Sequence, residues 1–246
     1  MPRVHDEKVS RPPVDAFVGW LADELLGRLG PGRRLVAVDG VDGSGKTTFA
    51  ATLALHLAQR RPTVLVHLDD YLNVAAVRHA RGRGSAEGFW LDSYDYALLH
   101  ERVLTPLGAD GEGTYRPPSY DVTSDMRSDG EPVVTDADAV TLVEGLFLHR
   151  DELNDVWDAS VFLDVPFAET VVRMAARDGG PADPEHPAMH RYVGGQRLYF
   201  AAARPWERAT FVVDNVDVTH PRCVAADESF AATELARHEG RAIGAE

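Results

Sequence analysis

The chain has 246 residues, of which 44% are hydrophobic and 26% are charged, and its 25 basic and 39 acidic side chains give a formal net charge of −14. This length fits one large α/β domain or two small ones, and the composition excludes disordered and fibrous proteins. The acidic excess argues against a nucleic-acid partner, because neutralising a phosphate backbone requires clustered Lys and Arg. An anionic ligand must therefore be bound by a local site.

The expected compartment is the cytoplasm. Polar residues interrupt the apolar runs, for example over residues 139–148, whereas a bilayer-spanning helix needs ~20 predominantly apolar residues, so no membrane partner is expected. The first residues, MPRVHDEKVSRPP, lack the apolar stretch of a secretory signal. The single cysteine, Cys223, cannot form an internal disulfide, which is typical of a reducing compartment.

Helices and strands alternate along most of the chain. Apolar side chains at four-residue steps predict a helix over residues 13–29, which Gly30-Pro31-Gly32 ends. Short apolar runs predict buried strands over residues 35–38, 64–68, 140–143, 161–164 and 211–214, and a helix over 46–60 connects the first two. Strands separated by helices predict a mostly parallel sheet that is covered on both faces.

Two segments interrupt this alternation. Residues 78–129 are rich in Gly, Pro, Ser, Asp and Tyr, and they contain one predicted helix, over 92–104. We expect them to form an insertion over the edge of the sheet. Residues 178–187 are rich in Pro and Gly and are expected to form a mobile loop.

One motif indicates a nucleotide site. Residues 40–47, GVDGSGKT, match G-x-x-x-x-G-K-[ST] between a predicted strand and a predicted helix. Glycines let backbone N–H groups surround the phosphates, and the helix N-terminus adds a partial positive charge. Lys46 is expected to reach the β- and γ-phosphates, and the Thr47 hydroxyl is expected to bind Mg²⁺. The expected nucleotide-binding residues are Gly40, Asp42, Gly43, Ser44, Gly45, Lys46, Thr47 and Thr48.

This motif predicts a bound nucleotide without defining the reaction. Lys8 and Lys46 are the only lysines, so the [NT]-K-x-D segment with which GTPases read guanine does not occur. The G-x-G-x-x-G turn of a Rossmann fold is also absent from this loop. The remaining candidates are a kinase that uses ATP and Mg²⁺ and an ATPase whose output is conformational.

Charged residues after the predicted strands favour a kinase. Asp69 and Asp70 end the second strand, and a carboxylate there could accept the proton of an acceptor hydroxyl or help hold the metal. Glu144 ends a later strand, where it could hold Mg²⁺. Arg173 and Arg177 lie one helical turn apart and could neutralise the transferring phosphoryl group. Each has a plainer explanation as a turn residue, a surface carboxylate or a solvated helix charge.

The ordered segments GVDGSGKTT, LDDY, YRPPSYDVTSDMR, LVEGLF and RMAARD resemble the uridine kinase group of P-loop kinases, which also contains phosphoribulokinase-like and pantothenate-kinase-like enzymes. The resemblance runs from about residue 34 to residue 214. It implies that Asp69 is the catalytic base, that Thr47 and Glu144 assist the metal, and that Arg173 and Arg177 are lid arginines. With Lys46, the expected catalytic residues are therefore Lys46, Asp69, Arg173 and Arg177.

The resemblance also implies an acceptor pocket. Asp92 matches the family aspartate that holds ribose hydroxyls, and residues 120–127 match the segment that contacts the base, with Tyr120 and Arg127 kept and Asp125 in place of a histidine. The full expected acceptor set is Asp69, Tyr71, Asp92, Tyr120, Asp125 and Arg127. A nucleoside is the expected acceptor, but Asp125 leaves pyrimidine recognition open. A sugar phosphate, a pantothenate-like acid, or an ATPase without an acceptor remain alternatives.

The expected architecture is thus an α/β P-loop three-layer sandwich. We divide the chain into an N-terminal helix and extension (1–32), a P-loop kinase domain (33–220) with an insertion (78–129) and a mobile lid (173–195), and a C-terminal tail or helix (221–246). A homo-oligomer is left open. Arg78, Arg81 and Arg83 could recognise an anionic substrate or form a solvated loop, and His186 and His190 lack the neighbours of a zinc site. Tyr199 and Phe200 are expected in the core.

Overall fold

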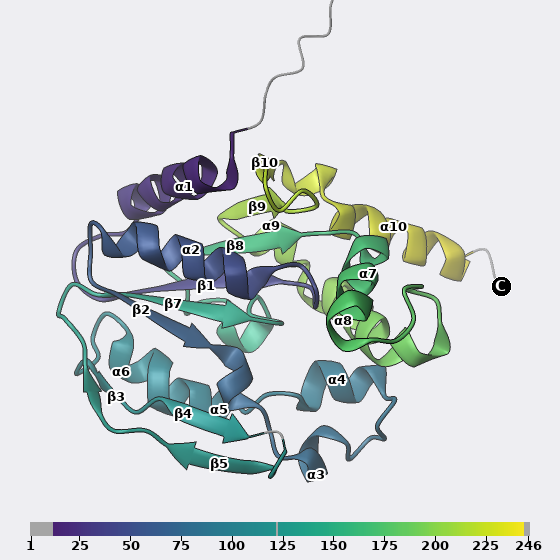
Figure 1. Cartoon of the computed structure of the whole chain (residues 1–246), viewed down its shortest axis with the longest axis horizontal. Helices are drawn as coiled ribbons and strands as arrows, with labels where there is room; N and C mark the ends of the chain where they lie inside the picture. The colour runs from purple at the N-terminus through teal and green to yellow at the C-terminus, as the bar shows by residue number, and fades with distance from the viewer. Residues whose placement is uncertain (1–11, 122, 244–246) are drawn as a thin grey trace, which may run out of the picture.

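A computed structural model describes residues 12–121 and 123–243 (Figure 1). Its centre is a six-stranded sheet of order β10-β9-β8-β1-β7-β2, in which only β10 runs antiparallel to its neighbour. The strands are β1 (Arg34–Gly40), β2 (Thr63–His67), β7 (Val140–Gly145), β8 (Ala159–Asp164), β9 (Phe211–Asp214) and β10 (Arg222–Val224). The predicted mostly parallel α/β fold is confirmed. The outer parts of the expected extension and tail, residues 1–11 and 244–246, and Val122 lie outside the described residues.

The sheet is buried on both faces, as the continuous apolar strands predict. On one face, Val36 and Val38 of β1 pack with α1 (Val14–Arg28) and α2 (Lys46–Ala58). On the other face, Leu35 and Ala37 pack with a second core to which the remaining long helices contribute. Two cores on opposite faces of one sheet give the three layers, and the predicted helices over 13–29 and 46–60 are confirmed to within two residues at each end.

The second face is covered by four groups of helices. These are α4 (Ala86–Asp92), α7 (Phe167–Asp178), α8 (His190–Ala203), and the helical run α5 (Tyr96–Leu99) that continues through a π-helical turn, His100–Leu104, into α6 (Thr105–Leu107). Glycine allows α4 and α8 to approach closely, because a Cβ at Gly195 would lie 2.7 Å from Cδ1 of Phe89. Trp206 of the short helix α9 (Pro205–Arg208) and two residues of α10 (Phe230–Ile243) also belong to this core, whereas the short helix α3 (Ala75–Arg78) has no buried residue.

The helix predicted over residues 92–104 is confirmed over residues 96–104, but its predicted start lies four residues too early. Asp92 is the last residue of α4, and a new helix begins at Tyr96. Two caps explain the break: the Ser85 hydroxyl accepts a hydrogen bond from the Gly88 N–H at 3.0 Å, and the Asp95 carboxylate accepts one from the Leu98 N–H at 2.9 Å. Each cap satisfies a free N–H of a helix's first turn, so two helices start where one was expected.

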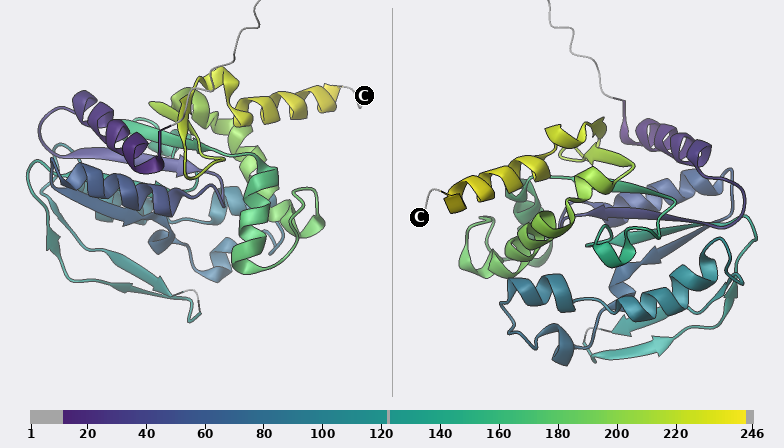
Figure 2. Two further views of the ribbon diagram at one scale, coloured as in Figure 1. Left: turned by 45° about the horizontal axis from the view of Figure 1, so that its top comes forward. Right: turned by 180° about the vertical axis from the view of Figure 1, so that it is seen from behind.

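The insertion ends in two thin antiparallel ribbons. They pair β4 (Pro118–Asp121) with β5 (Met126–Asp129), and β3 (Thr114–Tyr115) with β6 (Val133–Val134). Figure 2 shows these ribbons and α10 (Phe230–Ile243) on opposite sides of the molecule. The expected boundary at residue 220 falls just before β10, which pairs with β9, so the following segment extends the central sheet. No helix in the described ranges has the length and apolar character to cross a membrane.

Candidate active site

The glycine loop lies where β1 ends and α2 begins. Gly43 and Gly45 have φ values of +76° and +90°, a left-handed backbone that glycine adopts without strain. A Cβ at Gly43 would lie 2.7 Å from the carbonyl oxygen of Thr170 in α7. The loop is therefore pressed against α7 and holds a conformation that turns its backbone around a concave space.

Side chains from distant segments fix the loop carbonyls. Asn215, which follows β9, donates from Nδ2 to the Ser44 carbonyl at 2.8 Å. Arg173 donates to the carbonyls of Gly43 at 3.3 Å and Val216 at 2.8 Å. Lys46 donates from Nζ to the Val41 carbonyl at 2.9 Å. The Ser44 N–H also donates to the Val41 carbonyl at 3.1 Å, so these contacts together fix the shape of the loop.

The oxygen ligands of a divalent cation meet beside this loop. Glu144, which is 4% exposed, accepts hydrogen bonds on Oε1 from the Thr47 hydroxyl at 3.3 Å and from Nδ1 of His67 at 2.7 Å. A hydroxyl and a buried carboxylate are hard oxygen donors that suit Mg²⁺. The sequence did not single out His67, although it ends β2 directly opposite Glu144 in the strand register.

Asp69 and Asp70 occupy different environments. Both lie in a 3-10 turn, Leu68–Tyr71, because β2 ends at His67. Asp69 is exposed and accepts a hydrogen bond from the Tyr94 hydroxyl at 3.0 Å. Burial and the Asp69 charge raise the pKa of Tyr94 well above its usual value, so Tyr94 stays a donor. The pKa of Asp70 is raised, first by burial and then by the charges of Asp69 and Glu144, against the lowering effect of His67.

These groups surround one cavity of about 540 Å³. Phe89, Tyr94, Leu146 and Met174 form its apolar wall. The residues proposed from sequence that line it are Asp42, Gly43, Gly45, Lys46, Thr47, Thr48, Asp69, Glu144, Arg173 and Arg177. The structure thus brings the phosphate loop, the metal ligands and the Asp69 carboxylate to one space. Ser44 does not line this space, and its Oγ is buried without a hydrogen-bond partner in the described part of the chain.

The two arginines of α7 differ in their contacts. Arg173 is held by the loop carbonyls, whereas the Arg177 side chain is 61% exposed and pairs with Asp178 at 2.7 Å and Asp42 at 3.7 Å. Arg177 is therefore free to exchange these exposed carboxylates for a phosphate, while Arg173 supports the loop. The expected lid, residues 173–195, comprises the end of α7, a connecting loop and the start of α8.

The other acceptor residues do not line the cavity. Asp92 pairs with Arg81, with Nε 2.9 Å from Oδ2. The Tyr120 hydroxyl donates to the Asp125 carboxylate, which also accepts the Ala75 N–H at 2.8 Å. Arg127 donates to Asp95 at 3.1 Å and to the Leu72 carbonyl at 2.7 Å, and Tyr71 is buried. These contacts fasten the β4–β5 ribbon to the segment after β2.

A buried polar network behind the loop is absent from the sequence predictions. Asp39, fully buried at the end of β1, accepts hydrogen bonds from the Gly40 N–H at 2.7 Å, from Nδ1 of His149 at 2.7 Å and from the Tyr199 hydroxyl. Nε2 of His149 lies 2.9 Å from Oγ of Ser160. The network connects the first loop residue with α8, and the predicted burial of Tyr199 and Phe200 is confirmed.

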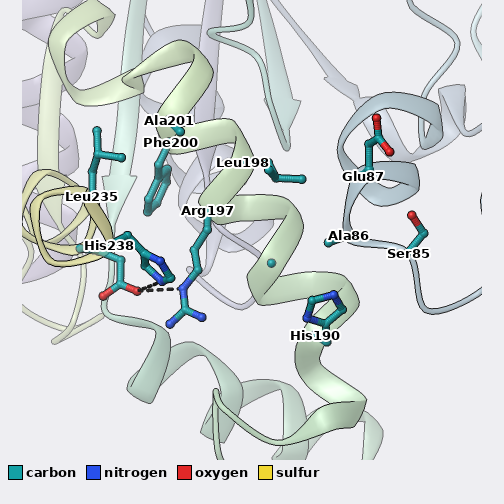
Figure 3. A pocket seen from close by; sticks show the side chains of 12 residues that line it. Ser85, Ala86, Glu87, His190, Arg197, Leu198, Phe200, Ala201, Leu235 and His238 are labelled. Carbon is teal, nitrogen blue, oxygen red and sulfur yellow. Dashed lines mark hydrogen bonds and ion pairs between the residues drawn. The ribbon is translucent and has the colours of Figure 1, made fainter. Parts of the chain in front are cut away.

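A second cavity, of about 730 Å³, lies between α4, α8 and α10, apart from the phosphate loop (Figure 3). Leu198, Phe200 and Leu235 give it apolar walls. Its central Arg197 pairs with Glu234 at 2.9 Å and with Glu185 at 2.6 Å, so its charge is matched. The Arg197–Glu234 pair connects α8 to α10, and both helices pack against the second face of the sheet.

A mostly parallel sheet whose first strand enters a glycine loop and a helix, with carboxylates at neighbouring strand ends, defines a P-loop nucleotide-binding protein. Residues 35–179, more than half of the chain, match the model of the Phosphoribulokinase / Uridine kinase family. The chain belongs to this family, and it is a kinase of the P-loop type.

Individual relatives agree with this assignment. A uridine kinase from Ureaplasma urealyticum is 26% identical over 145 residues, which cover 58% of this chain and 68% of the relative. The structure of a possible uridine kinase from Bacillus stearothermophilus superposes with a TM-score of 0.63 at 24% identity, covering 79% of this chain and 96% of the other. A protein from Silicibacter sp. TM1040, described as a candidate fructose transport system kinase, gives 0.62 at 27% identity, covering 76% and 95%.

Proposed function

We propose that this protein uses ATP and Mg²⁺ to phosphorylate a hydroxyl group of a small molecule. The observation that carries the proposal is the shared cavity, in which the Asp69 carboxylate faces the same space as Lys46, Thr47 and Glu144. A hydrolysing ATPase needs a positioned water, whereas a carboxylate held by a tyrosine at the end of β2 suits an acceptor hydroxyl. The single cysteine, Cys223, fits a cytoplasmic enzyme.

Each polar residue then has a role in transfer. The loop N–H groups and Lys46 bind the phosphates, and Thr47 and Glu144 would hold Mg²⁺, which neutralises charge on the β- and γ-phosphates when bound. Asp69 accepts the proton of the acceptor hydroxyl, and Tyr94 fixes the direction of the carboxylate through its 3.0 Å hydrogen bond. Arg177 stabilises the charge of the transferring phosphoryl group, and Arg173 keeps the loop in its binding conformation.

A nucleoside is the acceptor that the relatives named uridine kinase support. Asp92 is the residue proposed to hold ribose hydroxyls, and it could do so once its exposed pair with Arg81 opens. A second candidate is a non-nucleoside acceptor. It is favoured by Asp125, whose carboxylate is used by Tyr120 and the Ala75 N–H and which therefore does not present a group to a base.

Turnover of ATP with and without acceptors tests the proposal. We expect little ADP release from ATP alone and a large increase with one member of a panel of nucleosides, sugars, sugar phosphates and hydroxy acids. Lys46→Ala should abolish the increase. The control Arg60→Gln changes an exposed arginine just after α2 and should leave the increase unchanged. Rapid ATP hydrolysis that no acceptor accelerates would instead identify an ATPase.

A further inference from the structure

Positive side chains gather where the segment after α3 meets the start of α8. Arg78, His79 and Arg83 belong to one stretch of the insertion, and Arg191 comes from α8. Arg191 connects the two segments, because its Nη1 donates to the carbonyls of Arg83 at 3.2 Å and Ser85 at 3.5 Å. In a chain with a net charge of −14, this concentration of cations is a local exception.

Two of these arginines bind only neutral groups. Arg78 donates to the Asn73 carbonyl at 2.6 Å and to the Tyr120 hydroxyl at 2.9 Å. Arg191 donates only to carbonyls and lies over the ring of Phe89, 5.3 Å from its centroid. Over residues 12–121 and 123–243, neither forms an ion pair with a carboxylate, whereas the nearby Arg81 pairs with Asp92 and Glu87. Arg78 and Arg191 are half-buried, so water neutralises their charge incompletely.

The local field is accordingly positive. Burial lowers the pKa of His79, and Arg191, Arg83 and Arg78 lower it further, against Asp125. Burial and Arg78 likewise lower the pKa of Arg191, against Tyr192 and Asp92. His79 Nδ1 is buried and has no hydrogen-bond partner among the described residues. Asp125 and Asp92 offset part of this field, and a bound anion would supply further counter-charge and an acceptor for these donors.

The cluster adjoins the catalytic cavity. Phe89, over which Arg191 lies, lines the cavity together with Asp69. The close packing of α4 on α8 fixes this arrangement, because Gly195 leaves no space between α8 and Phe89. Phe89 is thus common to the wall of the cavity and to the contacts of Arg191.

We propose that Arg78, His79 and Arg191 form an anion-binding subsite, and that the phosphate acceptor carries a phosphate or carboxylate group that binds there. This inference rests on the proposed phosphoryl transfer and names the chemical class of the acceptor. A neutral nucleoside would leave Arg191 without an ion pair and would leave Arg78 with only Asp125, which it reaches through the Tyr120 hydroxyl. The carboxylate of Asp92 cannot serve both arginines, because Arg81 already holds it.

Binding of inorganic phosphate tests the subsite without any turnover. The phosphate loop is first filled with Mg²⁺ and a non-hydrolysable ATP analogue, and unfolding temperatures are then measured with phosphate or with chloride of equal ionic strength. We expect phosphate at ten times its dissociation constant to raise the unfolding temperature by about 2–4 °C. Arg191→Gln and Arg78→Gln should each lose this shift, and Arg60→Gln should keep it. No shift in the wild type, or an equal shift in Arg191→Gln, overturns the subsite.

Matched acceptors test its role in transfer. Ribose 5-phosphate and ribose, glycerate and glycerol, and pantothenate and pantothenol differ mainly in one acidic group. In the pair that the enzyme phosphorylates, we expect the acidic member to have at least tenfold higher kcat/KM than the neutral member. Arg191→Gln should remove this preference by raising the KM for the acidic acceptor, with the KM for ATP unchanged. A neutral preference overturns the acceptor class. Phosphate binding without transfer to any acceptor would instead refute the proposed kinase activity and leave the subsite standing.

Discussion

Replacing Asp39 by asparagine should weaken both the fold and the nucleotide site. The fully buried Asp39 carboxylate accepts four hydrogen bonds, from the Gly40 N–H, the His149 N–H and Nδ1, and the Tyr199 hydroxyl. The Gly40 N–H donates to one carboxylate oxygen and the other three groups donate to the second. An asparagine side chain has only one oxygen, so if that oxygen keeps the three donors, its NH₂ group faces the Gly40 N–H. One buried donor is then unsatisfied, at about 1–3 kcal/mol, and the other bonds lose their charge-assisted strength. We expect a total loss of about 3–5 kcal/mol, comparable to breaking a buried ion pair.

Urea unfolding and ATP kinetics separate the two effects. The free energy of unfolding gives the loss of stability, and a KM for ATP raised roughly tenfold would show that the loop has shifted, because Gly40 is its first residue. Tyr199→Phe is the matched control. It removes one donor from the carboxylate and the 3.0 Å acceptor of the His149 N–H, but that N–H keeps Asp39 at 3.3 Å, so the change should cost only about 1.5–3 kcal/mol. If Asp39→Asn unfolds within 1 kcal/mol of the wild type and keeps its ATP KM, the network does not position the loop.

Four further substitutions test the site and the fold. Lys46→Ala should lower kcat by ~10²-fold or more while far-UV circular dichroism stays unchanged, since Lys46 is a partly exposed residue at the start of α2. Asp69→Asn should lower kcat by ~10²-fold or more with little change in ATP KM, and Asp70→Asn should be much milder; the reverse order would move the base to Asp70. Burial and the charge of Asp214 raise the pKa of Asp164 from 3.8 to about 6, so the folded state binds the extra proton between those values and stability falls as pH rises through them. Asp164→Asn should flatten this part of the urea stability curve by at most about 3 kcal/mol, and an unchanged slope would show that Asp164 is already ionised at low pH.

Local sequence patterns predicted the sheet well, because its strands are apolar on both faces. The apolar runs at 35–38 and 140–143 have no other stable location than the centre of a covered sheet. The strand β10 has no such signal: it is three residues long and mostly exposed, and only its pairing with β9 defines it. The helix predicted over 92–104 was started too early because the prediction passed over Asp95, the capping residue after which α5 begins.

The nucleotide half of the site was predictable for a similar reason. The motif itself contains the glycines that adopt positive φ values. The carboxyl ends of parallel strands meet at one edge of the sheet, which brings Glu144 to Thr47. The residues that hold this half in place were not predictable. Asn215 and Tyr199 reach the loop from segments more than 150 residues away, and no local spacing indicates such a contact.

The acceptor half depends on side-chain pairs within an irregular insertion, so a resemblance in sequence does not fix its geometry. Asp125 illustrates this. It stands at a position implied to contact a base, yet it has a φ of +55° and holds the Ala75 N–H at the start of α3. Through Tyr120 it also sets the position of Arg78. On our proposal, Asp125 therefore influences acceptor choice by placing a cation of the anion subsite, and its role is one of position, without contact to the acceptor.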